Sequence, residues 1–154
     1  MKRSSLADAP CPIARGYNAI GDWWSLLVVT HVVLLGRGRF SQIQDELGIA
    51  KNILSSRLRK LVDEGILERE AVAEGGNRQV YVATEKGREL YKVLVPLMQW
   101  GQTYFFEADD CPRELVDRST GLAVAEVSIR SADGRELTLD DLRVLMHDGA
   151  DSSA

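Results

Sequence analysis

Basic side chains gather in one short stretch of a chain that is acidic as a whole. Between residues 37 and 60 there are six basic residues and only two acidic ones. The basic residues are Arg37, Arg39, Lys51, Arg57, Arg59 and Lys60. Guanidinium and ammonium groups at this density form an electrostatic footprint that suits phosphate. The stretch therefore has the chemistry of a nucleic-acid contact.

The acidity of the chain comes from its C-terminal third. The formal net charge is -4 and the pI is about 5.2. Residues 1–106 carry 14 Lys and Arg against 11 Asp and Glu, whereas residues 107–154 carry 5 against 12. The net charge therefore does not argue against a nucleic-acid partner, because the basic part and the acidic part are separate in sequence.

A helix is predicted to carry most of the basic stretch. Leu54, Leu58 and Leu61 recur at i, i+4 and i+7, and Gly65 is expected to end the helix. A helix over residues 51–64 is about 20 Å long, which is enough to lie in a major groove.

The polar face of this helix follows from its period. If the leucines point inward, steps of about 100° per residue place Asn52, Ser56 and Arg59 on the opposite face, with Ser55 and Lys60 on the flanks. Asparagine pairs with adenine, arginine with guanine or phosphate, and serine hydroxyls with phosphate oxygens. We expect these residues, with Lys51, Arg57 and Arg39, to contact DNA.

The surrounding elements predict a winged helix-turn-helix over residues 40–83. Residues 40–47 form an amphipathic helix, and Gly48 supplies the turn to the helix described above. Residues 66–72 and 78–83 are two strand-like segments around a turn-rich tip, which predicts a β-hairpin. The predicted fold is mostly α with a small β-hairpin wing (α+β), and Arg78 at the wing is expected to contact the minor groove or the DNA backbone.

The remaining helices predict a homodimer. We expect helices over residues 13–20, over residues 22–35, which are apolar almost all round, and from Thr84 to about Phe106, with a kink or interruption at Pro96. His31 lies inside the second of these and is expected to be a satisfied core histidine. The apolar surface of these helices exceeds what one small winged domain can cover.

Four segments are expected along the chain. They are a flexible arm over residues 1–10, a DNA-binding and dimerisation domain over 11–106, a small acidic β-containing C-terminal extension over 107–147, and a disordered tail over 148–154. Within the extension we expect a strand over residues 122–130, a turn at Asp133 and Gly134, and a short helix or strand over 137–146.

Five sequence segments resemble the HxlR-type family of bacterial winged-helix regulators. They are residues 11–15 (CPIAR), 21–28 (GDWWSLLV), 39–44 (RFSQIQ), 48–58 (GIAKNILSSRL) and 84–90 (TEKGREL). The resemblance extends over about Cys11 to Tyr104 and implies a dimeric repressor or activator that reads a palindromic operator with residues 51–60. Ala50 departs from the pattern because family members often place a capping serine there, and residues 71–77 replace a stretch that commonly contains proline.

Cys11 is a candidate sensor. It lies between two prolines at a helix start, where the helix dipole and nearby Arg15 favour the thiolate. In the family that the sequence resembles, a cysteine at the matching position serves some members as a redox or electrophile switch. The alternative is a small buried residue that packs the dimer. Cys111 lies outside the resemblance and is expected to be incidental.

Two further functions stay open at this point. Trp23 and Trp24 could line a cavity at the dimer helices that holds a small aromatic effector, although each tryptophan alone is more often a core residue. A winged fold can also serve as a protein-interaction module, which the acidic extension would suit. The basic helix face favours DNA, because an interaction module does not require it.

Other classes of protein are not expected. The sequence contains no phosphate loop, no zinc-ligand spacing and no nucleophile motif, so we predict neither an enzyme nor a bound metal or cofactor. Two distant cysteines and the absence of a secretory signal pattern favour the cytoplasm. The longest apolar stretch, residues 23–35, is shorter than the roughly 20 residues that cross a bilayer.

Overall fold

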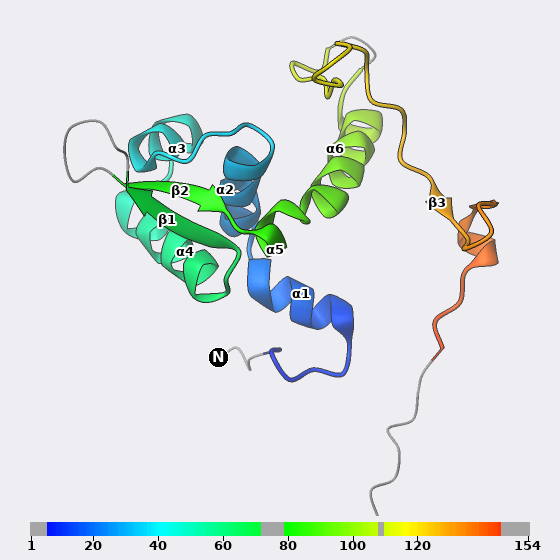
Figure 1. Cartoon of the computed structure of the whole chain (residues 1–154), viewed down its shortest axis with the longest axis horizontal. Coiled ribbons are helices and arrows are strands. Elements are labelled where there is room, and N and C mark those ends of the chain that lie inside the picture. The colour runs from blue at the N-terminus through cyan, green and yellow to red at the C-terminus, as the bar shows by residue number, and fades with distance from the viewer. Residues whose placement is uncertain (1–5, 72–78, 108–109, 146–154) are drawn as a thin grey trace, which may run out of the picture. The chain divides into compact units, whose positions relative to one another are not determined.

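The computed structural model describes residues 6–71, 79–107 and 110–145. The chain divides into two compact units, Met1–Leu94 and Val95–Ala154, which we describe separately (Figure 1). The structure has the predicted class, since helices predominate and a small antiparallel hairpin follows the fourth helix.

Five helices and one hairpin make up the first unit. The helices are α1 (Pro12–Ile20), α2 (Trp23–Val33), α3 (Phe40–Leu47), α4 (Lys51–Asp63) and α5 (Glu85–Arg88), and the strands are β1 (Leu67–Ala71) and β2 (Gln79–Ala83). Pro12 begins α1 at a position where its missing N–H costs nothing. Asp22 caps α2 by accepting a hydrogen bond from the backbone N–H of Ser25. Local sequence signals therefore set these helix starts.

The wing is an antiparallel pair to which the α2–α3 connection is attached. Leu67 pairs with Ala83, and Ala71 pairs with Gln79. The backbone N–H of Tyr81 donates to the carbonyl of Gly38 at 2.9 Å. A Cβ on Gly38 would lie 1.9 Å from the Tyr81 carbonyl oxygen, so only glycine allows this approach. The hairpin is thereby joined to the chain that enters α3.

The core of the first unit lies between α2, α3, α4 and the hairpin (Figure 1). Leu54, Leu58 and Leu61 of α4 are at most 1% exposed and pack with buried valines of α2. Each fully buried leucine or valine contributes about 1.5–3 kcal/mol of transfer free energy. The face of α4 that carries the leucines is thus fixed inward.

The predicted helix from Thr84 to Phe106 is two helices, α5 and α6 (Tyr91–Phe105). The prediction of an interruption at Pro96 is wrong, because Pro96 lies inside α6. The break comes earlier, where Leu90 and Val93 donate to carbonyls three residues back and tighten the chain. Gly87 packs directly on the Ile66 carbonyl, which fixes α5 against the end of α4.

The second unit contains little regular structure beyond α6. Two short strands, β3 (Ile129–Arg130) and β4 (Glu136–Leu137), pair around the predicted turn at Gly134, and the 3₁₀ helix η1 (Leu139–Asp141) follows. The strand predicted over residues 122–130 is formed only at its end, since Ala123 makes just an isolated bridge with Val116. Of the helix or strand predicted over residues 137–146, the described residues show the end of β4 at Leu137 and the 3₁₀ turn η1. None of the described helices has the length and apolar character needed to span a bilayer.

Candidate nucleic-acid interface

A tight glycine turn joins α3 to α4. Gly48 has φ +60° and ψ +26°, a left-handed conformation that favours glycine. Ile49 follows it and is 3% exposed, so the turn is anchored in the core. Ala50 is the N-cap of α4 and supplies no side-chain cap, as the sequence predicts. The first backbone N–H groups of α4 therefore have no capping side chain.

The outward face of α4 is polar and unengaged. Lys51, Asn52, Ser56 and Arg59 are exposed, and Ser55 is half-buried. Within the described part of the chain, none of these five side chains makes a hydrogen bond or an ion pair. The predicted division of α4 into a leucine face and a polar face is confirmed.

Arg57 is half-buried and paired with Asp22. Its Nε donates to Oδ1 of Asp22 at 2.9 Å, and both side chains are largely covered. Asp22 also accepts from the backbone N–H and the hydroxyl of Ser25. Burial by itself raises the pKa of Asp22, but the Ser25 hydrogen bonds and the Arg57 charge outweigh it and hold the pKa below its usual value. Asp22 therefore links the start of α2 to the middle of α4.

Lys60 makes a second link between α4 and the N-terminal helices. Its Nζ donates to the backbone carbonyl of Asn18 at 2.5 Å. A Cβ on Gly21 would meet the Tyr17 carbonyl at 2.7 Å and the Lys60 Nζ at 3.1 Å, so a glycine fits this crowded helix end. Arg57 and Lys60 fix the position of α4, while the exposed residues remain available to a ligand.

A buried histidine connects α2 to α3. His31 is 4% exposed, its Nδ1 is 2.9 Å from the Leu27 carbonyl, and its Nε2 is 3.3 Å from the Glu46 carboxylate. Arg37 donates to the same carboxylate at 2.6 Å, and this hydrogen bond, ahead of the Arg37 and His31 charges, lowers the pKa of Glu46. The expectation of a satisfied core histidine is confirmed.

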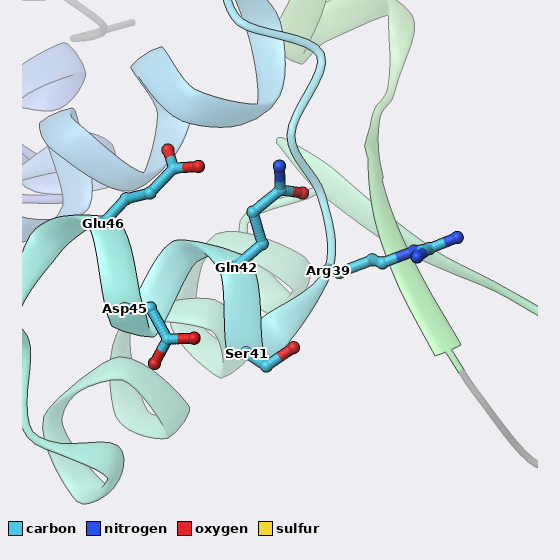
Figure 2. A pocket seen from close by; sticks show the side chains of 5 residues that line it. All are labelled: Arg39, Ser41, Gln42, Asp45 and Glu46. Carbon is cyan, nitrogen blue, oxygen red and sulfur yellow. The ribbon is translucent and has the colours of Figure 1, made fainter.

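Arg39 lies beside α3, at the edge of an open hollow of about 410 Å³. The other lining residues are Ser41, Gln42, Asp45 and Glu46. Figure 2 shows the Arg39 side chain pointing away from the carboxylates of Asp45 and Glu46. No described partner holds the Arg39 guanidinium, which is exposed. The hollow is polar and open, and Arg39 remains free for phosphate.

The remaining predicted site residues belong to segments of the chain other than α4. Arg78 lies outside the described residues. Cys11 is a free, exposed cysteine at the N-cap of α1, and Cys111 is free and half-buried in the second unit. Trp23 and Trp24 stack with ring centroids 3.8 Å apart, and Trp23 is 63% exposed.

The sequence does not reveal the Asp22–Arg57 pair. Asp22 is predicted as a helix cap, and Arg57 as a DNA contact. The two are 35 positions apart, and only the packing of α2 against α4 brings them together. The available signal is the helical period, because Arg57 lies three positions after Leu54 and four before Leu61 and therefore flanks the leucine face.

A turn-linked helix pair, an unengaged polar face on the second helix and a following hairpin define the winged-helix class of DNA-binding proteins. A model of the HxlR-like helix-turn-helix family matches residues 19–109. The chain belongs to the HxlR-like helix-turn-helix family and is a transcriptional regulator of this type.

Two comparisons extend over nearly the whole chain. An uncharacterized HTH-type transcriptional regulator of Mycobacterium tuberculosis is 34% identical over 126 residues, which are 82% of this chain and 79% of the relative. The crystal structure of PA1607, described as a candidate transcription factor, is 42% identical with a TM-score of 0.85 and covers 94% of this chain and 100% of its own.

Shorter solved structures match about two thirds of the chain. The redox regulator HypR in its oxidized form is 26% identical with a TM-score of 0.57, and the match covers 63% of this chain and 100% of HypR. The family is a helix-turn-helix family and the mycobacterial relative is named a transcriptional regulator, so a DNA partner follows from membership.

Proposed function

We propose that the chain binds a palindromic operator in duplex DNA as a homodimer, with α4 in the major groove, and represses the adjacent promoter. The observation that carries this proposal is the polar face of α4, where four exposed side chains have no partner in the described part of the chain. Buried leucines and the Asp22–Arg57 pair hold that face in place. Because the helix is already in place, binding requires little further ordering of its backbone.

Each exposed residue has a role in this proposal. Asn52 pairs with the adenine edge and Arg59 with guanine, because these pairings are bidentate in the major groove. Lys51, Ser55, Ser56 and Arg39 contact phosphate, which sets the orientation of the protein on the duplex. Arg78 at the wing contacts the neighbouring minor groove or backbone. Arg57 and Lys60 reach the duplex only from their anchored positions, so their main contribution is to hold α4.

Sequence-selective binding tests this proposal. Duplexes selected from a randomised pool should bind the wild type more tightly than scrambled duplexes in fluorescence anisotropy. Arg59→Ala and Asn52→Ala should each lose about 1–3 kcal/mol, roughly 5- to 150-fold in Kd, at constant salt. Arg118→Ala, an exposed arginine outside the winged domain, is the matched control and should bind normally. Absence of selectivity, together with unchanged binding by both α4 variants, would refute the proposal.

The dimer is supported by apolar side chains that one chain leaves uncovered. Trp23 is exposed on α2, and Trp100, Tyr104 and Phe105 are between 53% and 69% exposed on α6. A soluble protein rarely exposes so many large rings without a partner surface. A two-fold dimer also fits a palindromic operator, because the symmetry of the protein matches that of the site.

We further propose that oxidation or electrophile modification of Cys11 switches DNA binding. Cys11 is exposed at the N-cap of α1, and HypR, a similar protein, is described as a redox regulator. A mild oxidant such as diamide should release DNA from the wild type but not from Cys11→Ser, and Cys111→Ser should behave as the wild type does. Equal release from wild type and Cys11→Ser would leave Cys11 with a structural role.

A further inference from the structure

The second unit exposes a row of apolar side chains that its own fold does not cover. In the extension, Leu122, Ile129, Leu139 and Val144 are 69%, 55%, 84% and 88% exposed. Val95 is the one large apolar residue described in this unit that is buried. Burying apolar side chains is favourable, so this arrangement leaves stabilisation unrealised.

Polar contacts already hold the extension to α6. The amide of Gln99 donates from Nε2 to the Ala125 carbonyl at 3.0 Å, and its Oε1 accepts from the Val127 N–H at 2.9 Å. Gln102 donates from Nε2 to the Arg113 carbonyl at 2.8 Å. The hydrogen bonds use backbone groups of the extension and leave its apolar side chains free. The extension is thus fastened to α6 without a hydrophobic core.

The extended segment over residues 122–130 has little regular strand pairing. It makes a ladder only at Ile129–Arg130, with Glu136–Leu137 as its partner. Other hydrogen bonds satisfy much of its backbone, since the N–H of Asp117 donates to the Leu122 carbonyl, the N–H of Val124 donates to the Leu115 carbonyl, and Gln99 binds Ala125 and Val127. The exposed apolar side chains of this segment, rather than its backbone, therefore favour an additional protein surface.

The comparisons show that a similar protein has a counterpart of most of the extension. The 48 residues after Phe106 are about a third of the chain, so the PA1607 match over 94% of the chain includes most of them. A segment with little core of its own therefore keeps a similar fold in another protein. HypR is matched over its whole length by 63% of this chain, so the extension adds to a domain that is complete without it.

The charge distribution favours a second copy of this chain as the surface that covers the extension. Residues 107–154 carry 12 Asp and Glu against 5 Lys and Arg, and residues 1–106 carry 14 basic against 11 acidic residues. Each copy thus supplies an acidic extension and a basic domain, which attract one another between copies. The same acidity repels DNA and anionic lipid.

We propose that the extension is a dimerisation arm, whose exposed apolar residues over 122–145 are buried against a second copy of this chain. This inference rests on the homodimer of the proposed function and assigns part of its interface to residues outside the winged domain. The arm tightens the dimer and so raises operator affinity at low protein concentration, because two linked half-site contacts bind better than one.

Sedimentation equilibrium of the full chain tests the arm with two matched double variants. Leu122→Ser/Leu139→Ser removes exposed apolar side chains, and Glu126→Ser/Arg143→Ser removes exposed charged ones without changing the net charge. We expect the dimer Kd of the leucine variant to rise at least tenfold and that of the control to stay within twofold. A dimer Kd of the leucine variant within twofold of the wild-type value would show that the extension is not a dimerisation arm. A different protein partner would then be the surface that covers it.

A second readout separates the arm from the dimer itself. In a sample mixed from isotope-labelled and unlabelled chains, isotope-filtered NOEs from the Leu122 and Ile129 methyls should connect the two copies. A dimeric wild type without these NOEs overturns the arm alone. A wild type that stays monomeric in sedimentation overturns the proposed homodimer as well. Circular dichroism checks that the serine variants keep the helical content of the wild type.

Discussion

Asp22 shows how one carboxylate can serve two elements at the residue scale. It caps α2 through Ser25 and pairs with Arg57 of α4, so a single charged group sets the start of one helix and the position of the next. Removing it leaves the half-buried Arg57 without its partner, which is costlier than the pair is stabilising. Arg59, two positions along α4, faces solvent and has no such constraint.

The lowered pKa of Asp22 predicts an acid-dependent contribution to stability. A carboxyl whose folded pKa lies below its unfolded value of about 3.9 stabilises the native state above that pH. This contribution is lost as the pH falls from about 4 through the folded pKa. We therefore expect urea unfolding curves of wild type and Asp22→Asn to converge in unfolding free energy as the pH drops below about 4.

Asp63→Asn is the control for this titration. Asp63 is an exposed carboxylate near the end of α4 and has no ion pair among the described residues. The difference in unfolding free energy between wild type and Asp63→Asn should change less with pH than the difference for Asp22→Asn. Equal slopes for the two variants would show that the Asp22–Arg57 pair does not stabilise the folded state.

At the level of helices and strands, the hydrophobic periodicity and the glycines that end helices predict much of the winged domain. Residues 40–47 form a helix with the predicted bounds, because the apolar residues of α3 and the glycine after it are local signals. The leucine face of α4 is likewise local, since a strong i, i+4, i+7 pattern decides which side is buried. The exposed positions on α4 follow from the same pattern, so the unengaged polar face of the candidate site could be predicted.

Elements whose limits depend on tertiary contacts could not be predicted. The break between α5 and α6 comes at residues 89–90, just after Gly87 of α5 packs on Ile66, which is twenty-one positions earlier in the chain. The segment over residues 122–130 has strand propensity, yet within a single copy it finds a ladder partner only at its end. The partners of Arg57 and Lys60 lie on α1 and α2, and no local rule names them.

The contact between α5 and Ile66, just after α4, predicts that one methyl group added at Gly87 strongly affects the free energy of unfolding. A Cβ on Gly87 would lie 2.0 Å from the Ile66 carbonyl oxygen, which is far inside van der Waals contact. Gly87→Ala should therefore lower the unfolding free energy by about 1–3 kcal/mol, as overpacking does. Gly16→Ala, in the open on α1, should be neutral or stabilise by up to about 1 kcal/mol.

Thermal and urea unfolding of these two alanine variants measure the difference. If Gly87→Ala unfolds like the wild type, the packing of α5 against Ile66 is wrong. A loss of stability in Gly16→Ala as large as that in Gly87→Ala would mean that the helix bearing Gly16 is not free of contacts in solution.

At the scale of the whole molecule, charge and apolar surface are divided between two regions. The winged domain carries the basic helix proposed to face DNA, and the residues after Phe106 carry all of the net negative charge. In the account proposed here the first region binds phosphate and base edges, and the second strengthens the dimer. The overall acidity of the chain does not oppose DNA binding, because the electrostatic potential at the binding surface, rather than the net charge of the protein, acts on the DNA.

Salt dependence follows from this division. Each phosphate contact contributes about 0.9 to the slope of log Kobs against log salt. Replacing Lys51 by alanine should reduce the magnitude of the slope by about 0.9 for each phosphate that Lys51 contacts. It should weaken binding to selected and scrambled duplexes alike. An unchanged slope would place Lys51 away from the phosphates.

Hydroxyl-radical footprinting on a selected operator, with the stoichiometry measured by sedimentation, directly tests whether a homodimer binds the operator through α4. A homodimer that places α4 of each copy in the major groove should protect two symmetric half-sites about 10–10.5 base pairs apart, or a multiple of that spacing, with two chains per duplex. Arg59→Ala should lose the protection of both half-sites together. A single protected site with one chain per duplex, or protection that does not depend on sequence, would contradict the account.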